Sequence, residues 1–336
     1  MTAVASFWRG RRVAITGATG FVGYHLSLAL LRRGATVSAL VRNLDKARRL
    51  SDNGVRCVNV ALHDQPALTE ACTGCEFVFH LAGAVDFAED WQRFYSVNVE
   101  GTRCVLAAAR AAGVRRLVHT SSIVAVGALP QPKILDERAV WNLGYLKVPY
   151  ITTKRRAEEA VLAASESPPE VVVVNPASVI GPDDFFSSEF GTLCRRFWSG
   201  QIPLYFSGGH NCVDVRDVAE GHLLAAERGR AGERYLLTGT NRTYGEFFND
   251  LTRSAGRSIA RLRLPTGLAV LAAEITKHFQ PQDERPALNP NLARMQGLYF
   301  FFDCAKARSE LGYQPRPYRQ TLADTHAFWA TALGPV

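Results

Sequence analysis

Short apolar runs alternate with longer amphipathic segments through the first half of this 336-residue chain. The runs are about five residues long and rich in β-branched residues, which is typical of buried parallel strands. They cover residues 12–16, 36–41, 55–60, 77–80, 117–120 and 171–175. The segments between them have helical periodicity, at 21–33, 67–71, 91–112 and 149–164. This alternation predicts an α/β fold with a right-handed, doubly wound parallel sheet of the Rossmann type.

The pattern changes after residue 176. A Gly- and aromatic-rich stretch at 181–209 has no clear periodicity, and it is followed by a strand and helix at 213–228 and a strand at 234–238. Short helices are predicted at 244–255, 265–279, 303–311 and 320–329. We therefore predict a dinucleotide-binding domain at 1–176 plus about 210–240. A smaller, discontinuous C-terminal substrate lobe at 177–209 plus about 241–336 would cover the carboxyl ends of the strands, where ligands bind in such sheets.

Composition excludes several other classes of protein. The net charge is +8, but the basic residues come mostly in pairs rather than in one stripe, so we expect no nucleic-acid partner. The longest apolar stretch falls short of the roughly 18–20 residues of a membrane span, and the first residues lack the apolar core of a signal peptide. Seven scattered cysteines suit reduced thiols in the cytoplasm. Cys72 and Cys75 have the spacing of a metal or redox pair, but no second pair accompanies them, so we predict no metal site.

The strongest local signal is the glycine turn TGATGFVG at 16–23, between the first strand and the first helix. Gly17 allows the tight turn, Gly20 allows backbone N–H groups to approach a pyrophosphate, and Gly23 allows the helix to pack on the strand. A helix N-terminus favours that negative charge. We expect the rest of the turn (Thr19, Phe21 and Val22) to contact the dinucleotide too, while a purely structural turn is the alternative.

The end of the second strand predicts which dinucleotide binds. NAD sites usually carry a carboxylate there for the ribose 2′-hydroxyl, whereas this strand ends in Arg42 and Asn43. Arg42, supported by Lys46 or Arg48, is suited to a 2′-phosphate. We therefore favour NADP(H) and keep NAD(H) as the second choice. The alternative is that Arg42 is only a surface residue.

Tyr150 and Lys154 are four residues apart at the start of a predicted helix, so both side chains project from one face. An adjacent ammonium favours the phenolate form of tyrosine, and we therefore expect Lys154 to lower the pKa of Tyr150. Ser121 and Ser122 follow the fifth strand, at the same edge of the sheet as the glycine turn. The three parts predict a site for oxidoreduction in which a serine hydroxyl and the phenol hold one substrate oxygen.

Taken together, the motifs resemble the extended short-chain dehydrogenase/reductases of the NAD-dependent epimerase/dehydratase superfamily. Besides the glycine turn, TSS at 120–122 and the Tyr150/Lys154 pair, the resemblance rests on HLAG at 80–83, NVEGT at 98–102, NPASVIGP at 175–182, VDVRDVA at 213–219 and FDCAKARSELGYQP at 302–315. It covers nearly the whole chain. The members most similar to it are the dihydroflavonol reductases and the 3β-hydroxysteroid dehydrogenases.

The resemblance implies roles for particular residues. Ser122 rather than Ser121 is the catalytic serine, with Tyr150 and Lys154. Asn98 supports a proton-relay water through its main-chain carbonyl, although a helix-packing role is the alternative.

The same resemblance assigns further cofactor contacts. Lys154 also binds the nicotinamide ribose. The dinucleotide's other contacts are Leu81, Ala82 and Gly83 at the adenosine ribose and phosphates, and Pro176 and Val179 at the nicotinamide. Ala61 stands where the family often has an adenine-binding Asp, which leaves Leu62 as the contact there. The family commonly forms homodimers through the helices at 91–112 and 149–164.

Two enzymatic activities are compatible with these motifs. We favour an alcohol dehydrogenase or carbonyl reductase acting on a hydrophobic, ring-containing substrate. The aromatic residues that would form its pocket are Phe185, Phe186, Phe190, Phe197, Trp198, Tyr205 and Phe206, with Trp141 and Tyr145 beside them, although such residues are more often core. A nucleotide-sugar epimerase or dehydratase would usually have an Arg at His210 and an aromatic residue at Cys212. A non-catalytic cofactor sensor is the third hypothesis. Related non-enzymes typically lose the Tyr or the Lys, and the presence of both Tyr150 and Lys154 argues against it.

Overall fold

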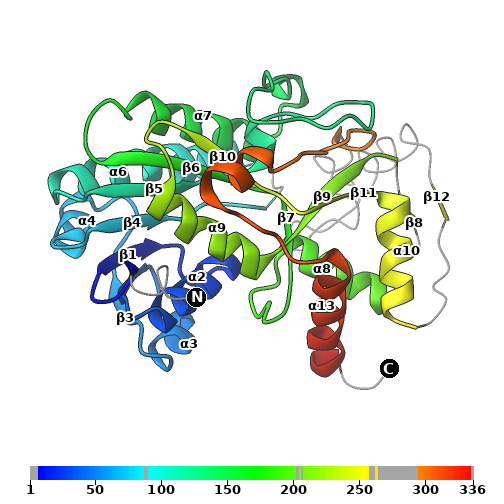
Figure 1. The fold of residues 1–336 in the computed structure, drawn as a ribbon, viewed down its shortest axis with the longest axis horizontal. Coiled ribbons are helices and arrows are strands. Elements are labelled where there is room, and N and C mark those ends of the chain that lie inside the picture. Colours follow the sequence, from blue (N-terminus) through cyan, green and yellow to red (C-terminus); the bar gives the residue numbers. More distant parts are fainter. Residues whose placement is uncertain are drawn as a thin grey trace.

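The computed structural model describes residues 7–86, 90–201, 204–205, 207–256, 262–263 and 294–333. Its centre is a seven-stranded parallel sheet with the order β10-β6-β5-β4-β1-β2-β3 (Figure 1). The strands are β1 (Arg12–Thr16), β2 (Thr36–Val41), β3 (Arg56–Asn59), β4 (Phe77–His80), β5 (Arg116–Thr120), β6 (Glu170–Pro176) and β10 (Arg234–Leu237). The predicted fold class is confirmed.

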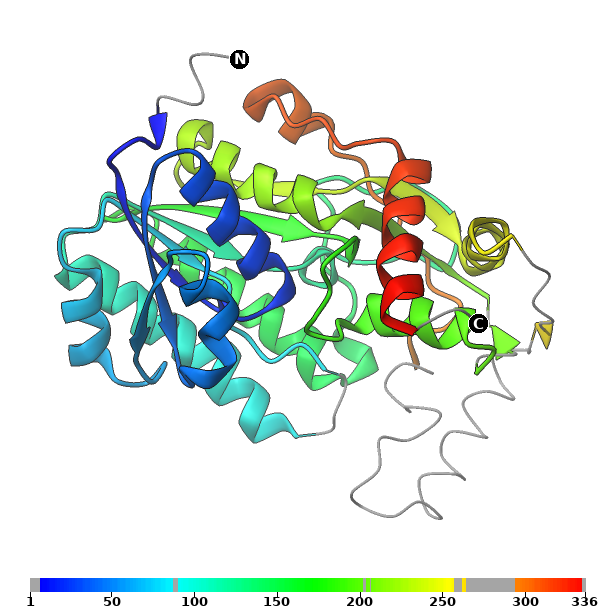
Figure 2. The same ribbon diagram turned by 90° about the horizontal axis from the view of Figure 1, so that it is seen from below.

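Helices cover both faces of this sheet. One face carries α2 (Phe21–Arg32) and α9 (Val215–Arg228), which lie side by side (Figure 2); the other carries α4 (Gln65–Cys72), α6 (Gly101–Ala111) and α7 (Pro149–Ala163). Short helical turns lie at Asp45–Ala47, Arg48–Ser51 (α3), Ile123–Ala125 and Gly144–Leu146. The central strands β1, β4, β5 and β6 are buried on both sides, which explains the continuous apolar runs of the sequence.

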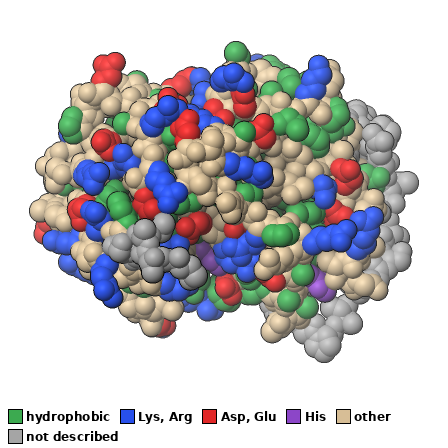
Figure 3. Space-filling model, in the orientation of Figure 1, with side chains coloured by type: hydrophobic (Ala, Val, Ile, Leu, Met, Phe, Trp, Pro, Cys, Tyr) green, Lys and Arg blue, Asp and Glu red, His purple; other side chains and the backbone are tan. Residues whose placement is uncertain are grey.

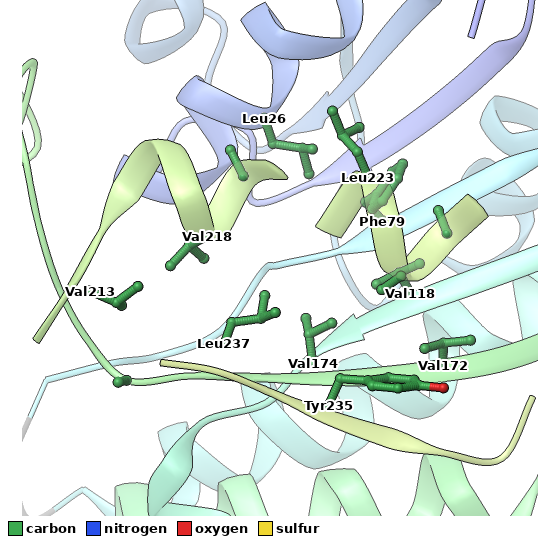
Figure 4. Close-up of a cluster of buried hydrophobic side chains, with 14 of the residues drawn as sticks. Leu26, Phe79, Val118, Val172, Val174, Val213, Val218, Leu223, Tyr235 and Leu237 are labelled. Atoms are coloured by element: carbon green, nitrogen blue, oxygen red, sulfur yellow. The ribbon is translucent and has the colours of Figure 1, made fainter. Parts of the chain in front are cut away.

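Successive residues of β1 pack into two different hydrophobic clusters, one on each face of the sheet. Val13 and Ile15 belong to the cluster that contains Leu26 of α2 and Leu223 of α9, which Figure 4 shows against the sheet. Ala14 between them belongs to the other cluster, with side chains of α4 and α6. Since successive side chains of a strand point to opposite faces, one apolar run supplies both layers.

The segment predicted as one helix at 91–112 has three parts. A short helix α5 (Trp91–Phe94) leads into a π-helical segment (Tyr95–Glu100), and α6 follows. A π-helical turn shifts the residues that follow relative to those before it, and such turns are frequent at functional sites. Asn98 lies inside this one.

Several segments from the second half of the chain form a lobe at one end of the molecule (Figures 1 and 2), while β6, β10 and α9 belong to the main sheet and its helices. Its three-stranded sheet has the order β11-β9-β7, from β7 (Ser178–Ile180), β9 (Gly209–Asp214) and β11 (Thr240–Thr243), beside a pair formed by β8 (Leu204–Tyr205) and β12 (Leu262–Arg263). The lobe's helices are α8 (Glu189–Trp198), α10 (Tyr244–Ser254) and α13 (Tyr318–Leu333), and a π-helical turn (Ala307–Leu311) precedes α13. The predicted helix at 265–279 lies outside the described residues.

Two details of the lobe differ from the sequence-based expectation. The stretch at 181–209, for which no regular structure was predicted, contains α8, whose cap is Ser188. β9 falls within the segment assigned to the dinucleotide-binding domain, but it pairs with β7 and β11. The division of the chain into two domains stays a prediction.

Within the described ranges, each helix is either too short or too polar to span a lipid bilayer. Basic and acidic side chains are interspersed over the face shown in Figure 3 rather than gathered by sign. All seven cysteines are free thiols, and burial raises the pKa of Cys72 to about 12. Cys72 ends α4, so the Cys72/Cys75 pair does not begin a helix, as a redox pair would.

The lobe core encloses an uncharged histidine. His210 on β9 is 2% exposed, and its ring contacts those of Phe190, Tyr244 and Phe247. Burial lowers its pKa to about 3. Because the unfolded chain binds a proton near pH 6.5 and the folded one does not, the resulting stability is present above pH 6.5 and is lost as the pH falls towards 3.

The variant His210→Phe is expected to make unfolding less sensitive to acid. It removes one group whose protonation favours the unfolded state, so the slope of unfolding free energy against pH should decrease by about 1.4 kcal/mol per pH unit between pH 6 and 4. Urea denaturation at several pH values measures this slope. The control is Leu251→Val, which also alters the lobe core but removes no ionisable group, so its slope should equal that of the wild type. An unchanged slope in His210→Phe would show that His210 is already protonated in the folded protein.

Candidate active site

The site lies where the order of the main sheet reverses. β1 and β4 are neighbours, and the chain continues outward from each of them in opposite directions, which opens a crevice beyond their carboxyl ends. The glycine turn follows β1 and the HLAG motif follows β4. Two hydrogen bonds join these segments. The Leu81 N–H donates to the Thr16 carbonyl at 3.1 Å, and the Ala82 N–H donates to the side-chain Oγ1 of Thr16 at 3.3 Å.

The glycine turn is packed too closely for other residues. Gly17 has φ +73°, and a Cβ there would lie 2.5 Å from the Ala82 nitrogen. A Cβ on Gly23 would lie 2.2 Å from the Gly17 carbonyl oxygen, so the start of α2 rests directly on the turn. Glycine is therefore required at both positions for these main-chain contacts.

The first turn of α2 suits a pyrophosphate. Gly20 is the N-cap and makes no side-chain cap hydrogen bond. Because the first N–H groups of a helix have no partner within the helix, those that follow Gly20 are available to an acceptor outside it. Thr19 and Val22 are partly exposed here, whereas Phe21 is buried against the ring of His25. The residues present fit a dinucleotide phosphate.

Ser122 and Tyr150 meet in this crevice. Ser122 caps the turn at Ile123–Ala125 in extended conformation, and Tyr150 is the second residue of α7. Their side chains are hydrogen-bonded, which lowers the pKa of the phenol, but burial is the larger effect and raises that pKa above its ordinary value. The two hydroxyl groups are thus close enough to hold one oxygen atom between them.

Lys154 lies one helical turn beyond Tyr150 and is 5% exposed. Its Nζ donates to the Thr120 carbonyl at 2.6 Å, and burial lowers its pKa to about 8. The expectation that Lys154 lowers the pKa of Tyr150 is therefore not met here. The ammonium bonds the end of β5, and desolvation governs the phenol.

Gly83 lies close to both Lys154 and Asn98. A Cβ on Gly83 would lie 3.9 Å from Lys154 Nζ and 3.1 Å from Asn98 Oδ1. The Asn98 side chain accepts from the Ala84 N–H at 2.7 Å and donates to Thr153 Oγ1 at 3.0 Å. Asn98 thus ties the HLAG loop to α7, and its main-chain carbonyl accepts a hydrogen bond of 2.6 Å from the Thr102 hydroxyl.

The other predicted cofactor contacts come from the ends of β2 and β6, from β7 and from the segment after β3. Arg42 is exposed directly after β2, and Leu62 packs over the position of Gly101. Pro176 ends β6, and Val179 lies on β7 opposite Val213. The structure therefore brings the glycine turn, the HLAG loop, Asn98, Ser122, Tyr150 and Lys154 together, while Arg42, Leu62, Pro176 and Val179 have no described contact with them.

The aromatic residues of the lobe divide between core and surface. Phe197 and Trp198 are buried in the lobe core, and Phe190 packs on His210, so these three are structural. Phe185 and Phe186 pack on the Tyr24 ring. Tyr205 contacts Phe248, Trp141 donates to the Val124 carbonyl at 3.0 Å, and Tyr145 is mostly exposed. Phe206 lies outside the described residues.

Sequence reasoning missed several buried polar residues around the site. His80 bonds Thr16 and Thr102, and His222 bonds the Thr120 hydroxyl at 2.8 Å. Glu158 lies one turn beyond Lys154 on α7. The repeated spacing of four from Tyr150 through Lys154 to Glu158 was the one signal that could have identified Glu158.

Comparisons with known proteins agree with this geometry. The model of the NAD-dependent epimerase/dehydratase family matches residues 13–238. "Sterol demethylase protein B" of Methylococcus capsulatus is 34% identical over 322 residues (94% of this chain, 97% of that protein), and "Putative dihydroflavonol 4-reductase" of Synechocystis is 34% identical over 316 residues (92% of each). The crystal structure of gox2253 is similar with a TM-score of 0.84 and 31% identity, covering 96% of this chain and 99% of that one.

Proposed function

The chain belongs to the NAD-dependent epimerase/dehydratase family, and on this premise we propose which reaction it catalyses. It is an NAD(P)-dependent oxidoreductase that acts on hydroxyl or carbonyl groups. The proposed reaction is the NADP(H)-dependent interconversion of a hydrophobic, ring-containing alcohol and its ketone. The observation that carries the proposal is the hydrogen bond between the buried Ser122 and the half-buried Tyr150, one helical turn before Lys154.

The side chains have distinct roles in this proposal. Ser122 and Tyr150 hold the substrate oxygen, and Tyr150 donates a proton to it during reduction, or accepts one during oxidation. Lys154 turns from the Thr120 carbonyl to the nicotinamide ribose, and Asn98 keeps the HLAG loop against α7. The bound nicotinamide supplies or accepts the hydride.

The cofactor would lie in the crevice beyond the carboxyl ends of β1 and β4. We propose that the pyrophosphate binds at Gly17, Thr19, Gly20, Phe21, Val22 and Gly23, with Leu81, Ala82 and Gly83 opposite. Leu62 would flank the adenine, and Pro176 and Val179 the nicotinamide. Arg42 would bind the 2′-phosphate of NADP(H), because a guanidinium matches the oxygen geometry of a phosphate.

Arg42→Ser is expected to weaken NADPH binding about 10- to 100-fold, since a charge-assisted hydrogen bond contributes about 1.5–3 kcal/mol. NADH affinity should change little, because NADH has no 2′-phosphate. Titration of the intrinsic fluorescence with each cofactor measures both constants. Arg56→Ser, an exposed arginine at the opposite end of the neighbouring strand β3, is the control and should leave both affinities as they are. Equal losses for NADPH and NADH would contradict the assigned role.

Two observations favour a hydrophobic substrate over a nucleotide sugar. Relatives that match almost the whole chain are named for a sterol demethylase and a dihydroflavonol 4-reductase. His210, at the position where epimerases usually carry an arginine, is uncharged inside the lobe core and is shielded from any diphosphate.

The substrate class is tested by absorbance at 340 nm. The protein is mixed with NADPH and, separately, a 3-ketosteroid, a dihydroflavonol and UDP-glucose, and NADP⁺ is tested with the corresponding alcohols. Oxidation of NADPH by a ring ketone is the expected result. Conversion of the UDP-sugar with no net change at 340 nm would favour an epimerase, and binding of NADPH with no turnover of any substrate would favour a cofactor sensor.

Assembly and location follow the same reasoning. We propose a homodimer formed through the helices at 91–112 and 149–164, as the family resemblance implies, and a location in the cytoplasm, which the seven free thiols favour.

A further inference from the structure

Helix α7 carries a buried carboxylate one turn beyond Lys154. Glu158 is 1% exposed and lies on the same face of the helix as Tyr150 and Lys154, since residues four apart are neighbours. Its Oε1 accepts from Arg234 Nη1 at 3.0 Å, and its Oε2 accepts from Asn175 Nδ2 at 2.6 Å. Burying a charge in this way is expensive even when the charge is paired, and an apolar side chain would often pack as well.

One hydrogen-bond partner of Glu158 also contacts the catalytic serine. Asn175 is wholly buried on β6, and its Nδ2 also donates to the Ser122 carbonyl at 3.0 Å. One amide group therefore bonds both the Glu158 carboxylate and the main chain of Ser122. Because Arg234 holds the other carboxylate oxygen, the position of the negative charge is fixed from two sides.

Among the titratable groups that affect the pKa of Lys154, Glu158 is the one that favours its charged form. From the strands, His80 and His119 face the lysine, and burial together with the lysine charge lowers the pKa of each, so both are neutral. From α7, the Glu158 carboxylate raises the pKa of Lys154 against the larger, lowering effect of burial. Glu158 itself faces the cations Arg234 and Arg155, and burial raises its own pKa.

We propose that Glu158 is a positioning residue that acts through Lys154: its carboxylate, fixed by Arg234 and Asn175, keeps the Lys154 ammonium charged beside the bound dinucleotide. The inference rests on the proposed function, in which that ammonium binds the nicotinamide ribose. A structural role alone would require only that the side chain fill its space.

The test follows the affinity for NADPH from pH 7 to 10, by fluorescence. Phosphate monoesters lose their second proton near pH 6, so the cofactor's charge is constant over this range. Wild-type affinity should fall around the pKa of Lys154, about 8. In Glu158→Gln the midpoint should move down by about one pH unit, because one unit corresponds to about 1.4 kcal/mol, an ordinary interaction between neighbouring charges in a protein. Glu158→Asp keeps the charge, and its midpoint should stay near that of the wild type.

The controls separate this charge effect from a change in folding. Lys154→Met should abolish the pH dependence, which assigns it to Lys154. Glu159→Gln, on the same helix but exposed, should titrate as the wild type does. Melting temperatures show whether each variant folds, and if Glu158→Gln does not, Glu158→Met should give the same displacement.

Each outcome decides between the two proposals. An unshifted midpoint in Glu158→Gln, an equal shift in Glu159→Gln, or a flat wild-type profile would overturn the role of Glu158 and leave the proposed function in place. If the wild type binds neither NADPH nor NADH at any pH, the proposed function itself is wrong.

Discussion

Tyr150→Phe is expected to lower kcat about 10³-fold while the Kd for NADPH stays within about twofold of the wild-type value. The phenol is the proton donor for the substrate oxygen, and a positioned general acid contributes about 10²- to 10⁴-fold. The ring remains in place against Phe94, so the shape of the crevice is kept. Steady-state rates at 340 nm and a fluorescence titration with NADPH give the two numbers.

The matched control for this variant is Tyr235→Phe. Tyr235 is a fully buried tyrosine on β10, and its hydroxyl donates to Glu310 at 2.8 Å. β10 is an edge strand of the main sheet, separated from β4 and the crevice by β6 and β5. Its loss should lower the melting temperature but not kcat. A Tyr150→Phe enzyme that retained wild-type kcat would remove Tyr150 from the mechanism.

Gly17→Ala is expected to weaken NADPH binding on the order of 100-fold or more. An alanine at φ +73° costs about 1–2 kcal/mol, and its Cβ would in addition overlap the main chain at Leu81 and Ala82. Relief of that overlap moves the turn away from β4, so the N–H groups at the start of α2 no longer converge on a phosphate. Fluorescence titration with NADPH, together with the melting temperature, measures the effect.

Gly10→Ala separates the overlap from the backbone strain. Gly10 has φ +75°, almost the value at Gly17, but no atom lies within 4 Å of an added Cβ. This control should lose a similar stability from the strain alone and bind NADPH as the wild type does. Equal affinities in the two variants would mean that the turn does not contact the cofactor.

The sheet and the glycine turn could be predicted from the sequence because their signals are local. The glycine turn ends the first apolar run, and β1, β2 and β4 begin and end at the predicted residues. Ser122, Tyr150 and Lys154 were predicted as one site because parallel strands place their carboxyl ends at the same edge.

What the sequence did not reveal depends on contacts between distant residues. Asn175 reaches Ser122 across 53 positions, and no periodicity records that contact. The helix α8 was missed because the composition of 181–209 resembles a loop, although Ser188 caps the helix and Phe197 anchors it in the lobe core. The raised pKa of Tyr150 follows from burial, which a sequence does not contain.

The most direct test of the account follows one hydrogen atom. The enzyme is supplied with NADPH that carries deuterium at the transferred position of nicotinamide C4, together with the ring ketone that the 340 nm assay identifies, and the product is analysed by mass spectrometry. We expect one deuterium on the carbinol carbon of each product alcohol formed by the wild type and almost no product from Tyr150→Phe. Product that forms without the label, or labelled product at the wild-type rate from Tyr150→Phe, would contradict this expectation.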